Sequence, residues 1–147
     1  MKTNCVYDKN KALVLELIQN AKIKMENDSV KFKNEFKKRL YGWVLRLIKF
    51  IDKLPKDSVC NVLGKQLLRS GTSILANYIE ANSASSKKDF INFFTYALKS
   101  ANESKVWLTL LKDTNKGDNN ELTWLLKELI EIANILASSI LTLKGRK

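Results

Sequence analysis

The fold is decided by one stretch of the chain, Arg69–Leu111, which reads RSGTSILANYIEANSASSKKDFINFFTYALKSANESKVWLTLL. We expect a helix down to about Ala81, a polar corner over residues 82–86, and a second helix from that corner. Apolar and small residues of the second helix recur at spacings of four and three, the period of a helix face packed against other helices. They are Phe90, Phe94, Ala97, Ala101, Ser104, Leu108 and Leu111.

The same period appears on both sides of this hairpin and predicts its partner helices. In residues 10–27 the stripe is Leu13, Val14, Leu17, Ile18, Ala21 and Met25. In residues 29–56 it is Phe36, Leu40, Trp43, Leu47, Phe50 and Leu54. In residues 57–85 it is Leu63, Leu67, Ser70, Ile74 and Tyr78, and small residues such as Gly64 and Gly71 let another helix approach. In residues 117–147 it is Leu122, Leu126, Leu129, Ala133, Leu136, Ile140 and Leu143.

Capping and breaking residues set the expected helix boundaries. Asp28 and Ser29 offer an N-cap between the first two stripes, and Pro55 ends the second. The later helices are expected to start at Asp57 or Ser58, at a capping box over residues 86–89, and at a second capping box over residues 118–121. Because the loops between helices are short, neighbours should be antiparallel. The prediction is an all-α protein, an antiparallel up-down four-helix bundle over residues 29–147, preceded by an extra N-terminal helix within residues 1–28.

Charge is the main functional signal. The chain has 26 Lys and Arg against 15 Asp and Glu, a net charge of +11, which suits an anionic partner such as nucleic acid. Residues 29–56 carry nine of the basic residues and only two acids. At 100° per residue, most of these lysines fall opposite the apolar stripe. The candidate nucleic-acid-binding residues are Lys31, Lys38, Arg46, Lys49, Lys53 and Lys56, the corner Lys87 and Lys88, and the tail Lys144, Arg146 and Lys147.

Several classes of chemistry find no support in the sequence. There is no histidine, which removes Ser-His and Cys-His nucleophiles and histidine-metal sites, and no Gly-rich phosphate loop occurs. Glu80 and Glu103 could in principle act as an acid–base pair, but Arg69, Lys99 or Lys105 would pair with such carboxylates more simply. We therefore expect no catalytic residue, no metal, no cofactor and no enzymatic activity.

The remaining bounds concern location. No apolar run approaches the roughly 18–20 residues that a membrane span needs, and Glu16 interrupts the apolar part of the N-terminus, so it lacks a signal-peptide core. Cys5 and Cys60 are too few for a disulfide framework or a zinc site, and we expect two ordinary reduced thiols. The protein is expected to be cytoplasmic.

The hairpin resembles a known family. The residues that carry the resemblance are Arg69, Ser70, Ser73, Ile74, Asn77 and Glu80, then Ser86, Lys87, Lys88, Asp89 and Phe90, then Ala97, Leu98, Lys99, Ser100 and Glu103. They look like the bacterial four-helix bundle proteins first noticed as open reading frames in intervening sequences of 23S ribosomal RNA genes. That family is related to the accessory variability determinant of diversity-generating retroelements. The resemblance covers about residues 31–144; Leu75 and Ala81 stand where the family usually has Pro and Gly.

The resemblance implies a left-handed bundle that assembles as a homopentameric barrel. For the retroelement relatives it implies a basic surface that binds nucleic acid and a reverse transcriptase. Two functions therefore stay open: a non-enzymatic oligomeric protein that binds RNA or DNA through lysines, or a protein–protein scaffold without a nucleic-acid role. The scaffold is suggested by apolar residues beside the core stripe, namely Val44, Leu45, Ile48 and Ile51, and by Trp107 and Trp124.

Overall fold

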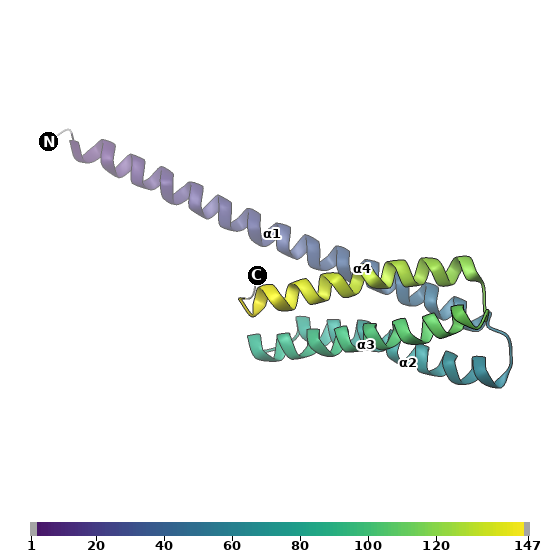
Figure 1. The fold of residues 1–147 in the computed structure, drawn as a ribbon. Helices are drawn as coiled ribbons and strands as arrows, with labels where there is room; N and C mark the ends of the chain where they lie inside the picture. The colour runs from purple at the N-terminus through teal and green to yellow at the C-terminus, as the bar shows by residue number, and fades with distance from the viewer. Residues whose placement is uncertain (1–2, 146–147) are drawn as a thin grey trace. The chain divides into compact units, whose positions relative to one another are not determined.

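The computed structural model describes residues 3–145, with side chains for residue 9 and residues 11–145. It consists of helices, without a strand in the described part of the chain (Figure 1). The helices are α1 (Thr3–Asp52), α2 (Ser58–Asn82), α3 (Lys87–Asp113) and α4 (Asn119–Leu143). The predicted all-α helical bundle is confirmed.

The chain divides into two compact units, Met1–Lys38 and Arg39–Lys147. In the first unit, α1 runs without interruption through Asp28 and Ser29, so the predicted helix break at these residues is wrong. No glycine or proline precedes Gly42, and nothing in this part of the sequence forces the backbone out of helical torsions. A residue that could cap a helix does not start one when the helix in front of it continues.

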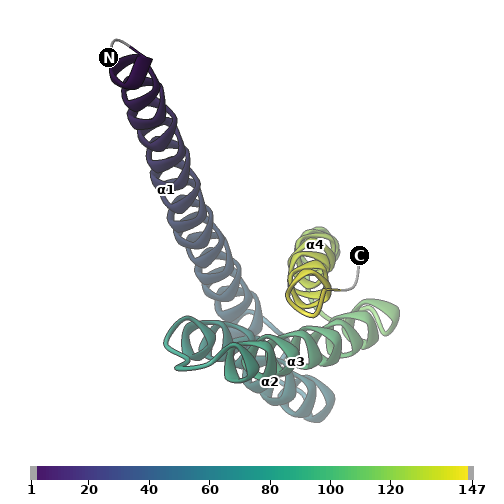
Figure 2. The same cartoon turned by 90° about the vertical axis from the view of Figure 1, so that its left-hand side faces the viewer.

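In the second unit, neighbouring helices run in opposite directions, as the order of their contacts shows. Between α2 and α3, Tyr78 packs on Phe94 with ring centroids 5.7 Å apart, and Ser70 contacts Ser104. In both views α2 and α3 lie side by side (Figures 1 and 2). Between α1 and α4, Arg39 pairs with Glu128, while Arg46 pairs with Glu121 further toward the N-terminus of α4.

The core of the bundle follows the predicted stripes closely. All six stripe residues of residues 36–54 are buried, and so are Phe94, Ala97, Ala101, Ser104, Leu108 and Leu111 of α3. In α4 the buried face is Leu122, Leu125, Leu129, Ile132, Ala133, Leu136 and Ile140. Leu126 and Leu143, expected inside, are half-buried. The face is turned because α4 packs on α1 as well as on α3: Trp43 Nε1 donates a hydrogen bond of 3.1 Å to the Leu125 carbonyl.

Three helix starts are capped by the residues that the sequence indicates. Asp57 accepts from the Cys60 N–H at 2.8 Å, and Ser86 accepts from the Asp89 N–H at 3.1 Å. Asp118 accepts from the Glu121 N–H at 2.9 Å. The Glu121 carboxylate does not complete a capping box, because it binds Arg46 instead.

Two glycines allow contacts that a side chain would block. A Cβ on Gly71 would lie 2.3 Å from Leu47 Cδ2, which confirms the predicted close approach of another helix at this position. Gly117, between α3 and α4, has φ +86°, and a Cβ there would lie 2.8 Å from Phe50 Cζ. The α3–α4 loop therefore seats directly on the end of α1, which fixes where α4 begins.

Candidate nucleic-acid interface

The predicted basic residues are exposed, but they do not form one continuous face. Lys31 and Lys38 belong to the first unit, where Lys31 Nζ lies 3.9 Å from Glu35 on the next helical turn. The remaining described candidates belong to the second unit and gather at two places. Arg146 and Lys147 lie outside the described residues.

The first gathering lies where α1 ends and α4 begins. Lys49 and Lys53, both exposed, border a hollow of about 420 Å³ together with Arg46, Phe50, Gly117, Asp118 and Glu121. We call Lys49 and Lys53 the α1–α4 cluster. Lys53 contributes to lowering the pKa of Glu121, although the hydrogen bond from Arg46 is the larger cause. Lys56 is also exposed, in the turn after α1.

Arg46 differs from the lysines beside it. Its Nε and Nη2 donate hydrogen bonds of 2.9 and 2.7 Å to the two oxygens of Glu121. The guanidinium carbon also lies 3.7 Å from the centroid of the Trp124 ring, a cation–π contact. The bond to Glu121 raises the pKa of Arg46, so it is always charged, but a carboxylate of its own bundle already offsets that charge. Arg46 holds α1 to α4, and helical spacing alone could not distinguish it from its free neighbours.

The second gathering lies where α3 begins and α4 ends. Lys87, Lys88 and Lys144 border one hollow of about 480 Å³ with Ile91, Asn92 and Thr95. We call Lys87, Lys88 and Lys144 the α3–α4 cluster. All three lysines are exposed, and no described carboxylate lies within 4 Å of their ammonium nitrogens. The sequence places Lys144 more than 50 residues from Lys87, so only the antiparallel course of α3 and α4 brings them together.

Between these clusters lies an ion-pair network that sequence reasoning missed. Arg39 binds both Glu128 and Glu131, and its Nη2 lies 3.1 Å from Glu128 Oε2. The two carboxylates raise the pKa of Arg39 further above its usual range, chiefly through the hydrogen bond from Glu128. One cation faces two anions here, so the middle of the α1–α4 contact is slightly acidic. The only sequence signal was the i, i+3 spacing of the two glutamates on one face of α4.

The hairpin motif turns out to join α2 to α3. Arg69 forms an ion pair with Glu103, as its sequence candidacy suggested, and Ser104 Oγ donates to Ser70 Oγ at 2.8 Å. The other motif residues serve the helices themselves. Asn77 Nδ2 donates to the Ser73 carbonyl at 2.9 Å, Ser86 caps α3, and Phe90 stacks on Phe94 with centroids 4.6 Å apart. Glu80 and Asp89 are exposed.

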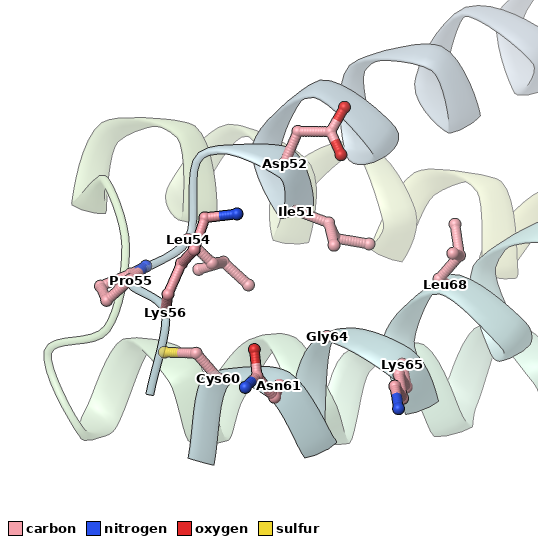
Figure 3. Close-up of a pocket in the computed structure, with 10 residues that line it drawn as sticks. All are labelled: Ile51, Asp52, Leu54, Pro55, Lys56, Cys60, Asn61, Gly64, Lys65 and Leu68. Carbon is pink, nitrogen blue, oxygen red and sulfur yellow. The ribbon is translucent and has the colours of Figure 1, made fainter. Parts of the chain in front are cut away.

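A further hollow of about 230 Å³ lies between the end of α1 and the start of α2. Figure 3 shows Ile51, Leu54 and Leu68 bordering it, with Asp52 and Lys65 turned away. Its one nucleophile, Cys60, is a free, buried thiol, and burial raises its pKa. A thiol with a raised pKa stays protonated at neutral pH and is a poor nucleophile. The Cys5 side chain lies outside those described.

Two general searches complete the description. In residues 3–145 no group of three or more Cys, Asp or Glu side chains could hold a metal ion. None of the described helices combines the length and the apolar character that crossing a membrane requires.

Comparison with known proteins places the bundle in a family. Residues 33–138 match the model of the 23S rRNA-intervening sequence protein family. A protein with unknown function from the S23 ribosomal protein family of Bacteroides thetaiotaomicron, known from its crystal structure, is 37% identical, with a TM-score of 0.68. The match covers 74% of this chain and 96% of that one. No curated protein matches. The chain belongs to the 23S rRNA-intervening sequence protein family.

Proposed function

We propose that this protein binds nucleic acid, without enzymatic activity, through lysines exposed at the ends of its helical bundle. The observation that carries the proposal is the separation of its basic residues into two kinds. Arg39, Arg46 and Arg69 are paired with carboxylates across helix contacts. The lysines of the α1–α4 and α3–α4 clusters are exposed, and no described carboxylate lies within 4 Å of their ammonium nitrogens.

Unpaired surface lysines bind phosphates by displacing condensed counterions. The affinity should therefore fall steeply as salt rises, and it should depend little on base sequence. A filter-binding titration of RNA and DNA at 50 and 200 mM salt tests the proposal. Absence of binding to both polymers at 50 mM would refute it.

The finer proposals rest on the resemblance of the hairpin motif to the retroelement relatives. They are a homo-oligomer, with a pentamer favoured, and a role as accessory protein of a retroelement reverse transcriptase. Measurement of the mass in solution tests the first, and a strict monomer at micromolar concentration would remove it. Co-purification with a reverse transcriptase encoded beside this chain tests the second.

One specific observation favours a second candidate, a protein–protein scaffold without a nucleic-acid role. The first unit is a single helix, and a single helix has no second element of its own against which to bury apolar side chains. Leu13, Leu17, Ile18 and Phe32 are all exposed to about half or more. A scaffold would retain its partner protein at salt concentrations that strip phosphate contacts, and it would ignore nucleic acid at 50 mM salt.

A further inference from the structure

We infer that the two lysine clusters of the bundle contact phosphates one helical turn apart on the same B-form DNA duplex. This inference rests on the proposed function and adds the class of polymer to it. The sequence predicts a single basic face, whereas the structure places Lys49 and Lys53 at one end of α4 and Lys87, Lys88 and Lys144 at the other.

The distance between the clusters follows from α4 itself. Glu121 borders the hollow of the α1–α4 cluster, and Lys144 borders that of the α3–α4 cluster. At a rise of 1.5 Å per residue, these two positions lie about 34 Å apart along the helix axis. One turn of B-form DNA is roughly 34–36 Å long, so phosphates on one side of the duplex recur at this spacing.

The surface of α4 between the clusters can lie along a duplex without opposing it strongly. Lys127, Asn134 and Ser138 are exposed and follow one another at spacings of seven and four, so they share one outer stripe of the helix. Glu128 and Glu131 are engaged by Arg39. The clusters would make the phosphate contacts, and the stripe would span the groove between them.

A single strand suits this surface less well. Sequence-independent binding of single strands uses a continuous basic groove with aromatic rings on which bases stack. Here the basic residues are interrupted by the Arg39 network, in which two carboxylates face one guanidinium. The Trp124 ring, beside the α1–α4 cluster, is covered by Arg46 at 3.7 Å. The surface therefore offers two separated contact points rather than one track.

The experiment compares ligands by fluorescence anisotropy at 50 mM salt, using the full chain. The probes are a 24-bp DNA duplex, an 8-bp duplex too short to reach both clusters, a 24-nucleotide single strand and a 24-bp RNA duplex. We expect the 24-bp DNA duplex to bind at least tenfold more tightly than each of the others. Lys49→Ala/Lys53→Ala and Lys87→Ala/Lys88→Ala should each remove most of that advantage, and each should flatten the salt slope by roughly two. The matched control, Lys65→Ala/Lys99→Ala, removes two exposed lysines outside both clusters and should keep it.

The possible failures differ in meaning. If no probe binds, the proposed function itself is wrong. If the 8-bp and 24-bp duplexes bind equally, or if only one cluster matters, lysines still bind nucleic acid but the clusters do not share one duplex. Tighter binding of the single strand or of the RNA duplex would likewise overturn the inference and leave the proposed function standing.

Discussion

Ser104 Oγ donates a hydrogen bond of 2.8 Å to Ser70 Oγ in the middle of the contact between α2 and α3, where both side chains are fully buried. The two hydroxyls satisfy one another where helices approach too closely for larger residues. Ser104→Ala should cost about 1–3 kcal/mol of unfolding free energy, because it leaves the Ser70 hydroxyl without this partner. The double variant Ser70→Ala/Ser104→Ala should cost less than the sum of the two single variants. Urea unfolding of all four proteins gives the coupling, and strictly additive losses would contradict it.

The α3–α4 loop gives a second test of packing. Gly117→Ala should lower the unfolding free energy by roughly 2–4 kcal/mol, because it combines a left-handed backbone with a Cβ only 2.8 Å from Phe50 Cζ. Gly145→Ala is the matched control: its φ is +69°, but nothing lies within 4 Å of an added Cβ. Gly145→Ala should therefore cost less than about 2 kcal/mol. Equal losses in the two variants would mean that the loop does not seat on α1.

The cap of α2 predicts a pH dependence of stability. The Cys60 N–H and, secondly, Lys116 hold the pKa of Asp57 at about 2, below its ordinary 3.8. A carboxyl whose pKa is lower in the folded state stabilises above about pH 4 and loses that contribution as pH falls through about 2. Asn at position 57 can still accept the capping hydrogen bond but cannot titrate. The difference in urea midpoint between the native protein and Asp57→Asn should shrink from pH 5 to pH 2; a constant difference would refute the link.

Arg46 and the α1–α4 cluster should separate stability from binding. Arg46→Ala should lower the thermal midpoint, since it removes the bidentate bond to Glu121 and the contact with Trp124. Lys49→Ala/Lys53→Ala should leave the midpoint nearly unchanged, because neither lysine holds two helices together, and should weaken binding of nucleic acid. The opposite pattern, in which Arg46 dominates binding and the lysines dominate stability, would overturn the division drawn here.

Most of the bundle could be predicted from sequence because apolar spacing and capping residues act locally. The stripe from Phe36 to Leu54 and the caps at Asp57 and Ser86 follow from neighbours within a few turns. The helix break at residues 28–29 failed because a capping residue matters only if the preceding helix ends. The turn of the α4 face toward Leu125 and Ile132 failed because it depends on a partner helix far away in the sequence.

The candidate interface was predictable only as a list of basic residues. Which of them are neutralised depends on tertiary pairing: Arg46 meets Glu121 across 75 positions of sequence, and Arg39 meets Glu128 across 89. The grouping of Lys144 with Lys87 and Lys88 depends on the same antiparallel packing. Helical periodicity places each residue on its own helix, but it does not say what the neighbouring helix brings to it.

The most direct test of the central claim, that unpaired lysines at the ends of the bundle bind phosphates, is the salt dependence of duplex DNA binding. With five lysines engaged, log K against log salt should fall with a slope of about −4 to −5 between 50 and 200 mM. Substituting all five by alanine should abolish binding and leave the helical content and thermal midpoint nearly unchanged. A slope near zero, or unchanged binding by the five-fold variant, would contradict the account.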